Sequence, residues 1–190
     1  EGKALLFKTF GDVDAIPICL DGKDPEKFIE MVKRLEPTFG GINLEDISSP
    51  KCYDIEDTLI EQMNIPVFHD DQHGTAIAAL ATVLGGLRLV RKDLATARIV
   101  MNGAGAAGSA IGRLLVNAGA KNLIMVDMAG ALYDGMPGLN RVQAQLAQMT
   151  NPRKLTGKLP EIARGADVLI GASGPGVFTK DIVGSLAKDS

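Results

Sequence analysis

The chain has 190 residues, with 20 Lys and Arg against 23 Asp and Glu, so its formal net charge at pH 7 is only −3. Hydrophobic residues make up 46% and charged residues 23% of the sequence, which excludes a chain kept disordered by charge and predicts a packed globular protein. The near-neutral balance and the absence of any Lys/Arg run longer than a pair exclude a surface built to bind a nucleic-acid backbone.

Short apolar runs alternate with helix-like stretches along the chain. This alternation is typical of α/β folds, in which crossover helices connect parallel strands. In the first half, we expect strands over residues 15–20, 42–44 and 66–68, and helices over 25–35, 53–63 and 74–90. Asp24 and Pro25 mark the start of the first helix, because Asp caps helix N-termini and Pro fits the first helical position.

The polar stretch 91–96 is the expected boundary between two parts, residues 1–93 and residues 94–190. In the second part, we expect strands over 98–101, 122–126 and 168–170, and helices from the glycine-rich turn to about 118, over 141–149 and over 159–164. The fold class predicted is therefore α/β, with a parallel-sheet part followed by a Rossmann-type dinucleotide-binding domain.

A glycine-rich turn follows the first expected strand of the second part and opens a helix. Its residues are Gly103, Ala104, Gly105, Ala106, Ala107 and Gly108. In such a turn the first glycine permits the tight bend, the second lets the backbone approach a pyrophosphate, and the third allows close helix packing. The helix N-terminus adds unpaired N–H groups for the phosphates. We therefore predict a dinucleotide site, with a purely structural glycine turn as the alternative.

Asp127 ends the next expected strand, about twenty residues after the turn, as the dinucleotide fingerprint requires. Its carboxylate is placed to accept hydrogen bonds from the adenosine ribose, and its charge would repel a 2′-phosphate, which favours NAD over NADP. A neighbouring cation would reverse that preference. We also expect Ser173 and Gly174, in the glycine-rich segment after the last strand, to contribute to the cofactor site.

Two pairs of adjacent acids, Glu45-Asp46 and Asp70-Asp71, follow two expected strands of the first part. Ligands of open α/β sheets bind beyond the carboxyl ends of the strands, so the four carboxylates are expected to converge there. Clustered carboxylates repel one another unless a hard cation is present, and oxygen donors suit Mg²⁺ or Mn²⁺. The alternative is that these acids lie on solvated loops.

His69 and His73 flank the second acidic pair at a spacing of four residues. We expect the segment between them to be a strand end and a loop rather than a helix. Without a third His or Cys nearby, zinc binding is the weaker interpretation. We therefore expect both histidines to support the neighbouring acids or the packing.

Four strings of the sequence, taken together and in this order, resemble the malic enzyme family over essentially the whole chain. They are Gly2-Lys3, Asn43-Leu44-Glu45-Asp46, Phe68-His69-Asp70-Asp71-Gln72-His73-Gly74-Thr75-Ala76 and Asn102-Gly103-Ala104-Gly105-Ala106-Ala107-Gly108. The resemblance implies oxidative decarboxylation of L-malate to pyruvate and CO₂, with NAD or NADP as hydride acceptor and with Mg²⁺ or Mn²⁺. It assigns malate and metal binding to residues 1–93 and NAD binding to residues 94–190.

The resemblance also implies roles for single residues. Glu45, Asp46 and Asp71 match the metal ligands of the family. Lys3 matches its general base, and Asp70 matches an acid that assists proton handling; a nearby dication would lower the lysine pKa and help it exist neutral. Thr75 matches a residue near the cofactor. The alternative for Lys3 is a lysine on a solvated, mobile chain end.

Malic enzymes also use a general-acid tyrosine and substrate-binding asparagines on segments that would lie before Glu1 and beyond Ser190. Neither Tyr53 nor Tyr133 matches that tyrosine, so both parts are expected to be incomplete and activity of this chain alone is doubtful. Two rival functions stay open. One is decarboxylation of oxaloacetate or conversion of malate to lactate without net redox, and the other is a non-catalytic nucleotide-binding module.

Three further expectations concern membrane insertion, cellular compartment and oligomeric state. The longest apolar stretch, residues 75–87, is too short and too weakly hydrophobic to span a bilayer. Cys19 and Cys52 show no metal or redox spacing, and the N-terminus lacks the plan of a signal peptide, so we expect a cytoplasmic protein with reduced cysteines. The family resemblance implies a homodimer or a higher homo-oligomer.

Overall fold

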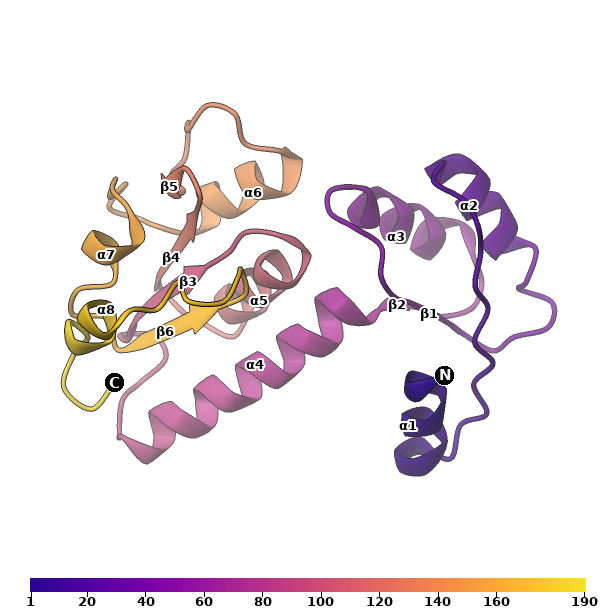
Figure 1. Ribbon diagram of the computed structural model, residues 1–190, viewed down its shortest axis with the longest axis horizontal. Helices are drawn as coiled ribbons and strands as arrows, with labels where there is room; N and C mark the ends of the chain where they lie inside the picture. Colours follow the sequence, from indigo (N-terminus) through magenta and orange to yellow (C-terminus); the bar gives the residue numbers. More distant parts are fainter.

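Helix α4 (Asp70–Leu89) is the longest element of the chain and connects its two parts (Figure 1). The computed structural model describes residues 1–190. The first part contains α1 (Gly2–Gly11), α2 (Pro25–Lys33), β1 (Ile42–Leu44), α3 (Lys51–Gln62) and β2 (Val67–His69). The second part contains β3 (Arg98–Asn102), α5 (Ala106–Asn117), β4 (Asn122–Asp127), β5 (Gly130–Ala131), α6 (Arg141–Met149), α7 (Leu159–Ile162), β6 (Val168–Gly171) and α8 (Lys180–Gly184).

The first part is built on two short parallel strands, β1 and β2. Helix α2 begins as expected, because the Asp24 carboxylate accepts hydrogen bonds from the first backbone N–H groups and Pro25 occupies the first helical position. Val32, Leu44 and Leu59 then bury their side chains in one small core between the helices and the strands. This packing fixes the position at which both strands end.

Two predictions for the first part are wrong. Residues 15–20 form no strand: they run as an irregular and mostly exposed segment, because no neighbouring strand offers hydrogen bonds to them. The segment after β2 is not a loop, because α4 begins at Asp70 rather than at residue 74. Acidic residues are favourable in the first turn of a helix, where they face its positive N-terminus. Both Asp70 and Asp71 therefore lie in that first turn.

The second part is a sheet in the order β5-β4-β3-β6, in which β3, β4 and β6 run parallel and the short β5 pairs antiparallel with β4. Residues alternate between its two faces. Ile99 and Met101 face the core formed with α4, α5 and α6, whereas Val100 faces the core formed with α7 and α8. The α/β class with parallel strands and a Rossmann-type second part is therefore confirmed.

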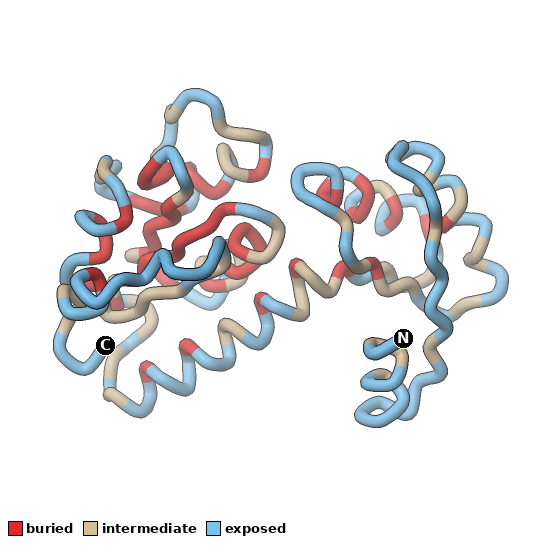
Figure 2. The backbone as a smooth tube through the Cα atoms, viewed as in Figure 1, coloured by how far each residue is buried: buried red, intermediate tan, exposed pale blue.

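Burial concentrates on the central strands and on α5, whereas α1 and the segment after it are exposed (Figure 2). The largest core also includes Cys52 and Tyr53 from α3, together with Ala76 and Val83 from α4. Residues of both parts thus share one hydrophobic core. No helix of the structure combines the length and the hydrophobicity needed to cross a membrane.

Candidate functional site

The acidic pairs lie together because β1 and β2 end together. The parallel register places Leu44 opposite His69, so each strand continues directly into an acidic pair at the same edge. Asp46 adopts a left-handed conformation with φ 58°, which turns the chain away immediately after Glu45. Its backbone N–H then donates a hydrogen bond of 2.9 Å to Oδ2 of Asp71.

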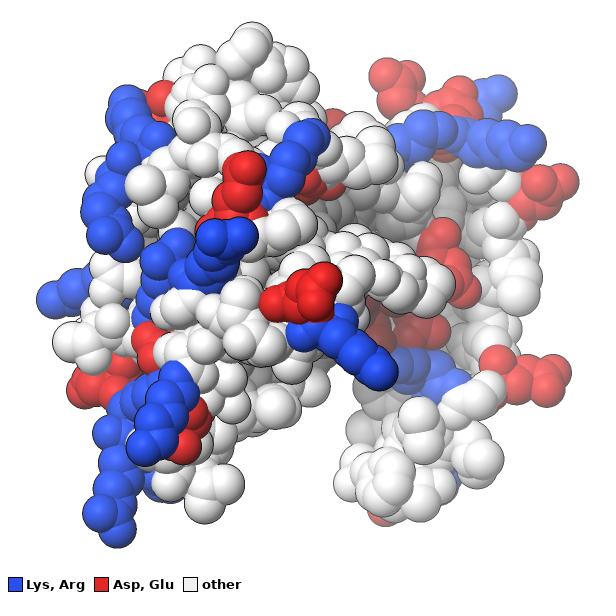
Figure 3. Space-filling view, turned by 60° about the vertical axis from the view of Figure 1, so that its left-hand side comes forward, with Lys and Arg blue, Asp and Glu red and all other residues white.

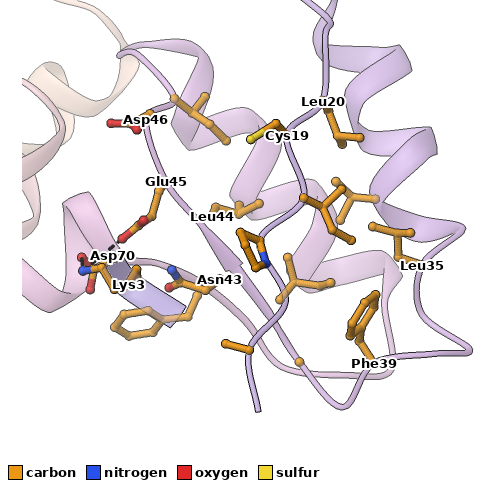
Figure 4. Close-up of a pocket in the computed structure, with 18 of the residues that line it drawn as sticks. Lys3, Cys19, Leu20, Leu35, Phe39, Asn43, Leu44, Glu45, Asp46 and Asp70 are labelled. Carbon is orange, nitrogen blue, oxygen red and sulfur yellow. Dashed lines mark hydrogen bonds and ion pairs between the residues drawn. The ribbon is translucent and has the colours of Figure 1, made fainter. Parts of the chain in front are cut away.

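Lys3 of α1 bridges the two acidic pairs (Figure 4). Its Nζ lies 2.6 Å from Oδ2 of Asp70 and 3.0 Å from Oε1 of Glu45. Gly74 makes room for this arrangement, because a side chain there would overlap the Asp70 carboxylate. The hydrogen bonds that the Lys3 ammonium donates to Asp70 and then to Glu45 raise the pKa of Lys3 well above its usual value. In this arrangement Lys3 is a cation held by two carboxylates.

The carboxylate oxygens are the type of donor that a hard dication prefers. Their side chains, however, do not converge on one point where they could share an ion. No group of three or more His, Cys, Asp or Glu side chains is arranged to hold a metal ion. Glu45 points toward Lys3 and Asp70, whereas the Asp46 carboxylate lies apart from them (Figure 4). A cation already bridges two of the acids, which indicates that this edge of the sheet requires positive charge. Oxygen donors of this kind suit Mg²⁺ or Mn²⁺.

A cleft of about 1410 Å³ opens beside this edge. Lys3, Glu45, Asp46 and Asp70 line it together with apolar side chains from α2 and from the segment after α1. Oδ1 of Asn43 is buried beside the acids without a hydrogen-bond partner. The cleft therefore offers a polar end with a cation and several carboxylates, which suits a small polar ligand.

One buried carboxylate near the acidic pairs, that of Glu56, was not predicted from the sequence. Glu56 of α3 accepts hydrogen bonds from the backbone N–H of His69 and from the side chain of Gln72, and it lies 2.8 Å from Nε2 of His73. The available signal was its position on the apolar face of α3, four residues after Cys52 and three before Leu59. A charged residue on such a face is buried only when it is well paired.

The glycine-rich turn has the geometry of a pyrophosphate site. Gly103 has φ +109°, and a side chain there would strike the backbone of Ala172. Gly108 lies so close to the carbonyl oxygen of Gly103 that even a methyl group would overlap it. Gly105, in contrast, faces open space, and α5 begins immediately after it. The turn thus leaves an open face in front of the helix N-terminus, where a phosphate would be stabilised.

The other predicted cofactor residues lie around this turn. Asp127 ends β4, and its carboxylate accepts hydrogen bonds from Met128 N–H and from the side chain of Gln143. Oγ of Ser173 accepts a 2.7 Å hydrogen bond from the buried Asn102, a residue that the sequence analysis did not assign to the site. Figure 3 shows basic and acidic side chains interspersed over this part of the molecule.

The remaining predicted cofactor residues lie in the turn, in α5, after β6 and on α4. Ala104 is buried within the turn, Ala106 and Ala107 form the first turn of α5, and Gly174 lines a small cavity after β6. Thr75 is exposed on α4, one turn beyond Asp71. The structure therefore groups Lys3 with the acids, and groups the glycine turn with Asp127 and Ser173. The assignments of individual roles stay predictions.

Two family models match the chain. The model for the malic enzyme N-terminal domain matches residues 1–60, and the model for the malic enzyme NAD binding domain matches residues 72–190. Together they cover both parts of the fold.

Individual relatives agree with these models. A bifunctional malic/malolactic enzyme of Bacillus subtilis is 50% identical over 190 residues, which are 100% of this chain and 46% of that protein. An NADP-dependent malic enzyme of Escherichia coli is 47% identical over 191 residues, covering 99% of this chain and 25% of its own length. The crystal structure of an NAD-dependent malic enzyme from Thermotoga maritima superposes with a TM-score of 0.94 at 46% identity, over 98% of this chain and 50% of that one. The chain thus spans half or less of the length of these relatives.

Proposed function

The chain belongs to the malic enzyme family, and we propose that it supplies the catalytic core of an enzyme that converts L-malate to pyruvate and CO₂ while reducing NAD or NADP. The observation that carries this proposal is Lys3, held by Glu45 and Asp70 at the ends of β1 and β2, in the same chain as a dinucleotide turn. We assign metal and malate binding to residues 1–93 and NAD binding to residues 94–190.

The proposed metal ligands are Glu45, Asp46 and Asp71. Their support is their shared position at one sheet edge, with Asp71 hydrogen-bonded to the backbone of Asp46. Mg²⁺ or Mn²⁺ held by these three residues would supply Lewis-acid chemistry, making the C2 hydroxyl of malate more acidic and stabilising the negative charge that develops when CO₂ leaves. The side chains of Glu45 and Asp46 would have to turn toward Asp71 to share one ion.

Lys3 and Asp70 are the proposed proton-handling pair. Lys3 can accept the proton of the C2 hydroxyl only after it has given up its own, and Asp70 lies 2.6 Å away to receive it. The raised pKa of Lys3 in the ion pair means that the isolated pair holds the proton on Nζ. A dication bound by the neighbouring acids would repel that proton and shift the balance toward neutral Lys3.

The proposed cofactor site is the turn Gly103–Gly108 with Thr75, Asp127, Ser173 and Gly174. The open face at Gly105 supports it, because nothing occupies the space before the α5 N-terminus. We propose NAD as the preferred cofactor, since the Asp127 carboxylate at the end of β4 would repel a 2′-phosphate. Relatives of both cofactor types exist, as their names state.

A second candidate function is conversion of malate to lactate without net redox. The Bacillus subtilis relative, named a bifunctional malic/malolactic enzyme, favours this alternative at 50% identity. Both functions use the same first step at C2 of malate. They differ in whether the reduced cofactor is released or returns its hydride to pyruvate.

We further propose that the protein acts in the cytoplasm as a homodimer or higher homo-oligomer. Two free cysteines support a reducing compartment. Large apolar side chains exposed on α1, among them Leu5 and Phe10, support burial against another protein surface. Sedimentation velocity tests the oligomer, and a single monomeric species at micromolar concentration would contradict it.

The function is tested by incubating a chain extended at both ends, to the length of its relatives, with L-malate, Mn²⁺ and NAD and measuring NADH, pyruvate and lactate together. We expect equal amounts of NADH and pyruvate. Lactate without NADH would instead establish the second candidate. Binding of NAD and Mn²⁺ without any loss of malate would show a nucleotide-binding module.

Lys3→Arg sharpens this test, because arginine keeps the positive charge beside Glu45 and Asp70 but does not give up its proton. We expect kcat to fall on the order of 100-fold or more, as for loss of a general base, with malate binding largely kept. Lys8→Arg on the same helix, whose partners Asp12 and Asp14 are almost fully exposed, is the matched control and should keep full activity. Equal activity of both variants would exclude Lys3 as the base.

A further inference from the structure

A buried polar network lies beneath the acidic site and is not used by the function proposed above. Glu56 is only 4% exposed, yet it keeps its carboxylate at the junction of β2 and α4. It accepts hydrogen bonds from His69 N–H at 3.1 Å and from Gln72 Nε2 at 2.8 Å, and Nε2 of His73 lies 2.8 Å away. A buried carboxylate with three such partners is fixed in place.

Glu56 determines how the amide of Gln72 is oriented. Nε2 of Gln72 lies 2.8 Å from Oε2 of Glu56 and also 2.8 Å from Nδ1 of His69. A carboxylate only accepts hydrogen bonds, so the amide nitrogen and not the amide oxygen must face it. The second hydrogen of the same NH₂ group then points at His69. Nδ1 of His69 is therefore an acceptor and carries no hydrogen.

This arrangement selects one tautomer of His69. A neutral imidazole with an accepting Nδ1 carries its hydrogen on Nε2. The His69 side chain is 0% exposed, and Nε2 has no hydrogen-bond partner in the structure. Nε2 lies 3.5 Å from Oδ2 of Asp71, slightly outside hydrogen-bond geometry. A fully buried N–H donor thus faces the carboxylate that is the proposed metal ligand.

We propose that His69 is a positioning residue: Glu56 and Gln72 hold it as the Nε2–H tautomer, and its N–H orients the Asp71 carboxylate for metal binding. This inference rests on the proposed function, in which Asp71 binds Mg²⁺ or Mn²⁺. Carboxylates that bind metals are generally held by hydrogen bonds from outer groups, and loss of such a group weakens metal binding about 10- to 100-fold. The Asp46 N–H already donates a hydrogen bond to the same oxygen, Oδ2 of Asp71.

The tautomer is tested first, on the metal-free protein, by long-range ¹H–¹⁵N correlation NMR of the histidine rings. We expect the His69 ring to carry its hydrogen on Nε2. Gln72→Met, which keeps the length of the side chain but removes both amide hydrogens, should shift His69 toward a mixture of tautomers. A hydrogen on Nδ1 in the unaltered protein would overturn the proposal without any bearing on the reaction.

The orienting role is tested by two substitutions of His69 that remove the same ring. The amide nitrogen of Gln reaches the place of Nε2, whereas that of Asn reaches only the place of Nδ1. Mn²⁺ binding is measured by electron paramagnetic resonance of the free ion. His69→Gln should stay within about 3-fold of the unaltered protein, and His69→Asn should bind about 10-fold more weakly.

The two variants also need equal stability, which thermal unfolding without metal measures. Equal loss of Mn²⁺ affinity in both variants would overturn the proposal, because His69 would then act through packing alone. Asp71→Ala separates the inference from its premise. If Asp71→Ala binds Mn²⁺ as tightly as the unaltered protein, the proposed metal site fails, and with it the orienting role, whatever the tautomer of His69.

Discussion

Gly105 and Gly108 belong to the same turn, yet a methyl group would meet different surroundings at the two positions. At Gly108 it would overlap the carbonyl oxygen of Gly103, so the backbone would have to move. At Gly105 it would meet nothing within 4 Å, and the backbone angles there, φ −81° and ψ −162°, suit any residue. Gly108 is therefore needed for packing, and Gly105 for access to the cofactor.

We expect Gly108→Ala to lower the free energy of unfolding by about 1–3 kcal/mol, as overpacking does. Gly105→Ala should leave the unfolding temperature unchanged but weaken NADH binding about 10-fold or more, because its methyl group fills the space that the pyrophosphate needs. Thermal unfolding and NADH fluorescence titration measure the two effects. Normal NADH binding by Gly105→Ala would contradict the assignment of the open face.

At the level of single residues, the sequence predicted those parts of the site whose residues lie close together in the chain. The glycine turn and the acidic pairs can be read directly, because both depend on neighbours in the chain. The ion pairs of Lys3 could not be read, because they join α1 to residues 42 and 67 positions away. The network of Glu56 could not be predicted for the same reason, since its partners come from β2 and α4.

At the level of elements, strong hydrophobic patterns and caps predicted most helices and strands. Helix α6 has the expected bounds, and its start is fixed by the Asn140 capping box. Helix α1 was missed because it buries no residue and so shows no pattern of a core face. The apolar run 15–20 was misread as a strand, because its sequence contains no information about the missing partner strand.

Asp167, just before β6, joins that strand to the segment after α4 and to the start of β3. Its carboxylate accepts a hydrogen bond from Lys92, which follows α4. It accepts a second from the backbone N–H of Arg98, at the start of β3. Partial burial alone would raise the pKa of Asp167, but the Lys92 ammonium and the Arg98 N–H outweigh it and hold the pKa below its usual value. The Asp167 side chain is 22% exposed, so solvent screens these contacts only in part.

We expect Asp167→Asn to lower the free energy of unfolding at pH 7 by about 1–2 kcal/mol. A lowered pKa in the folded state stabilises the fold above the unfolded pKa of about 3.9, and this stabilisation is lost as the pH falls through the lower folded pKa. The difference between variant and unaltered protein should therefore shrink below about pH 4. Urea unfolding at several pH values measures it. Asp134→Asn, whose partner Lys154 is largely exposed, is the control and should change little at any pH.

At the scale of the whole molecule, α3 joins the acidic site to the dinucleotide part. Tyr53 of α3 is buried in the core shared with α4, α5 and β3, and its hydroxyl lies 3.3 Å from Oγ of Ser109 on α5. At the surface, Arg141 of α6 pairs with Asp54 and Asp57 of the same helix α3. The two parts are thus held by a shared buried core around Tyr53 and by one exposed cluster of charges.

The buried contact should dominate the stability of this junction. Tyr53→Ala removes a large side chain from a packed core and should cost about 3–5 kcal/mol of unfolding free energy. Arg141→Met, which removes ion pairs between exposed side chains, should cost less than about 1 kcal/mol. Urea unfolding followed by circular dichroism measures both, and a smaller denaturant slope for Tyr53→Ala would show that the parts then unfold separately. Equal losses in the two variants would mean that charges, rather than the shared core, hold the acidic site against the dinucleotide turn.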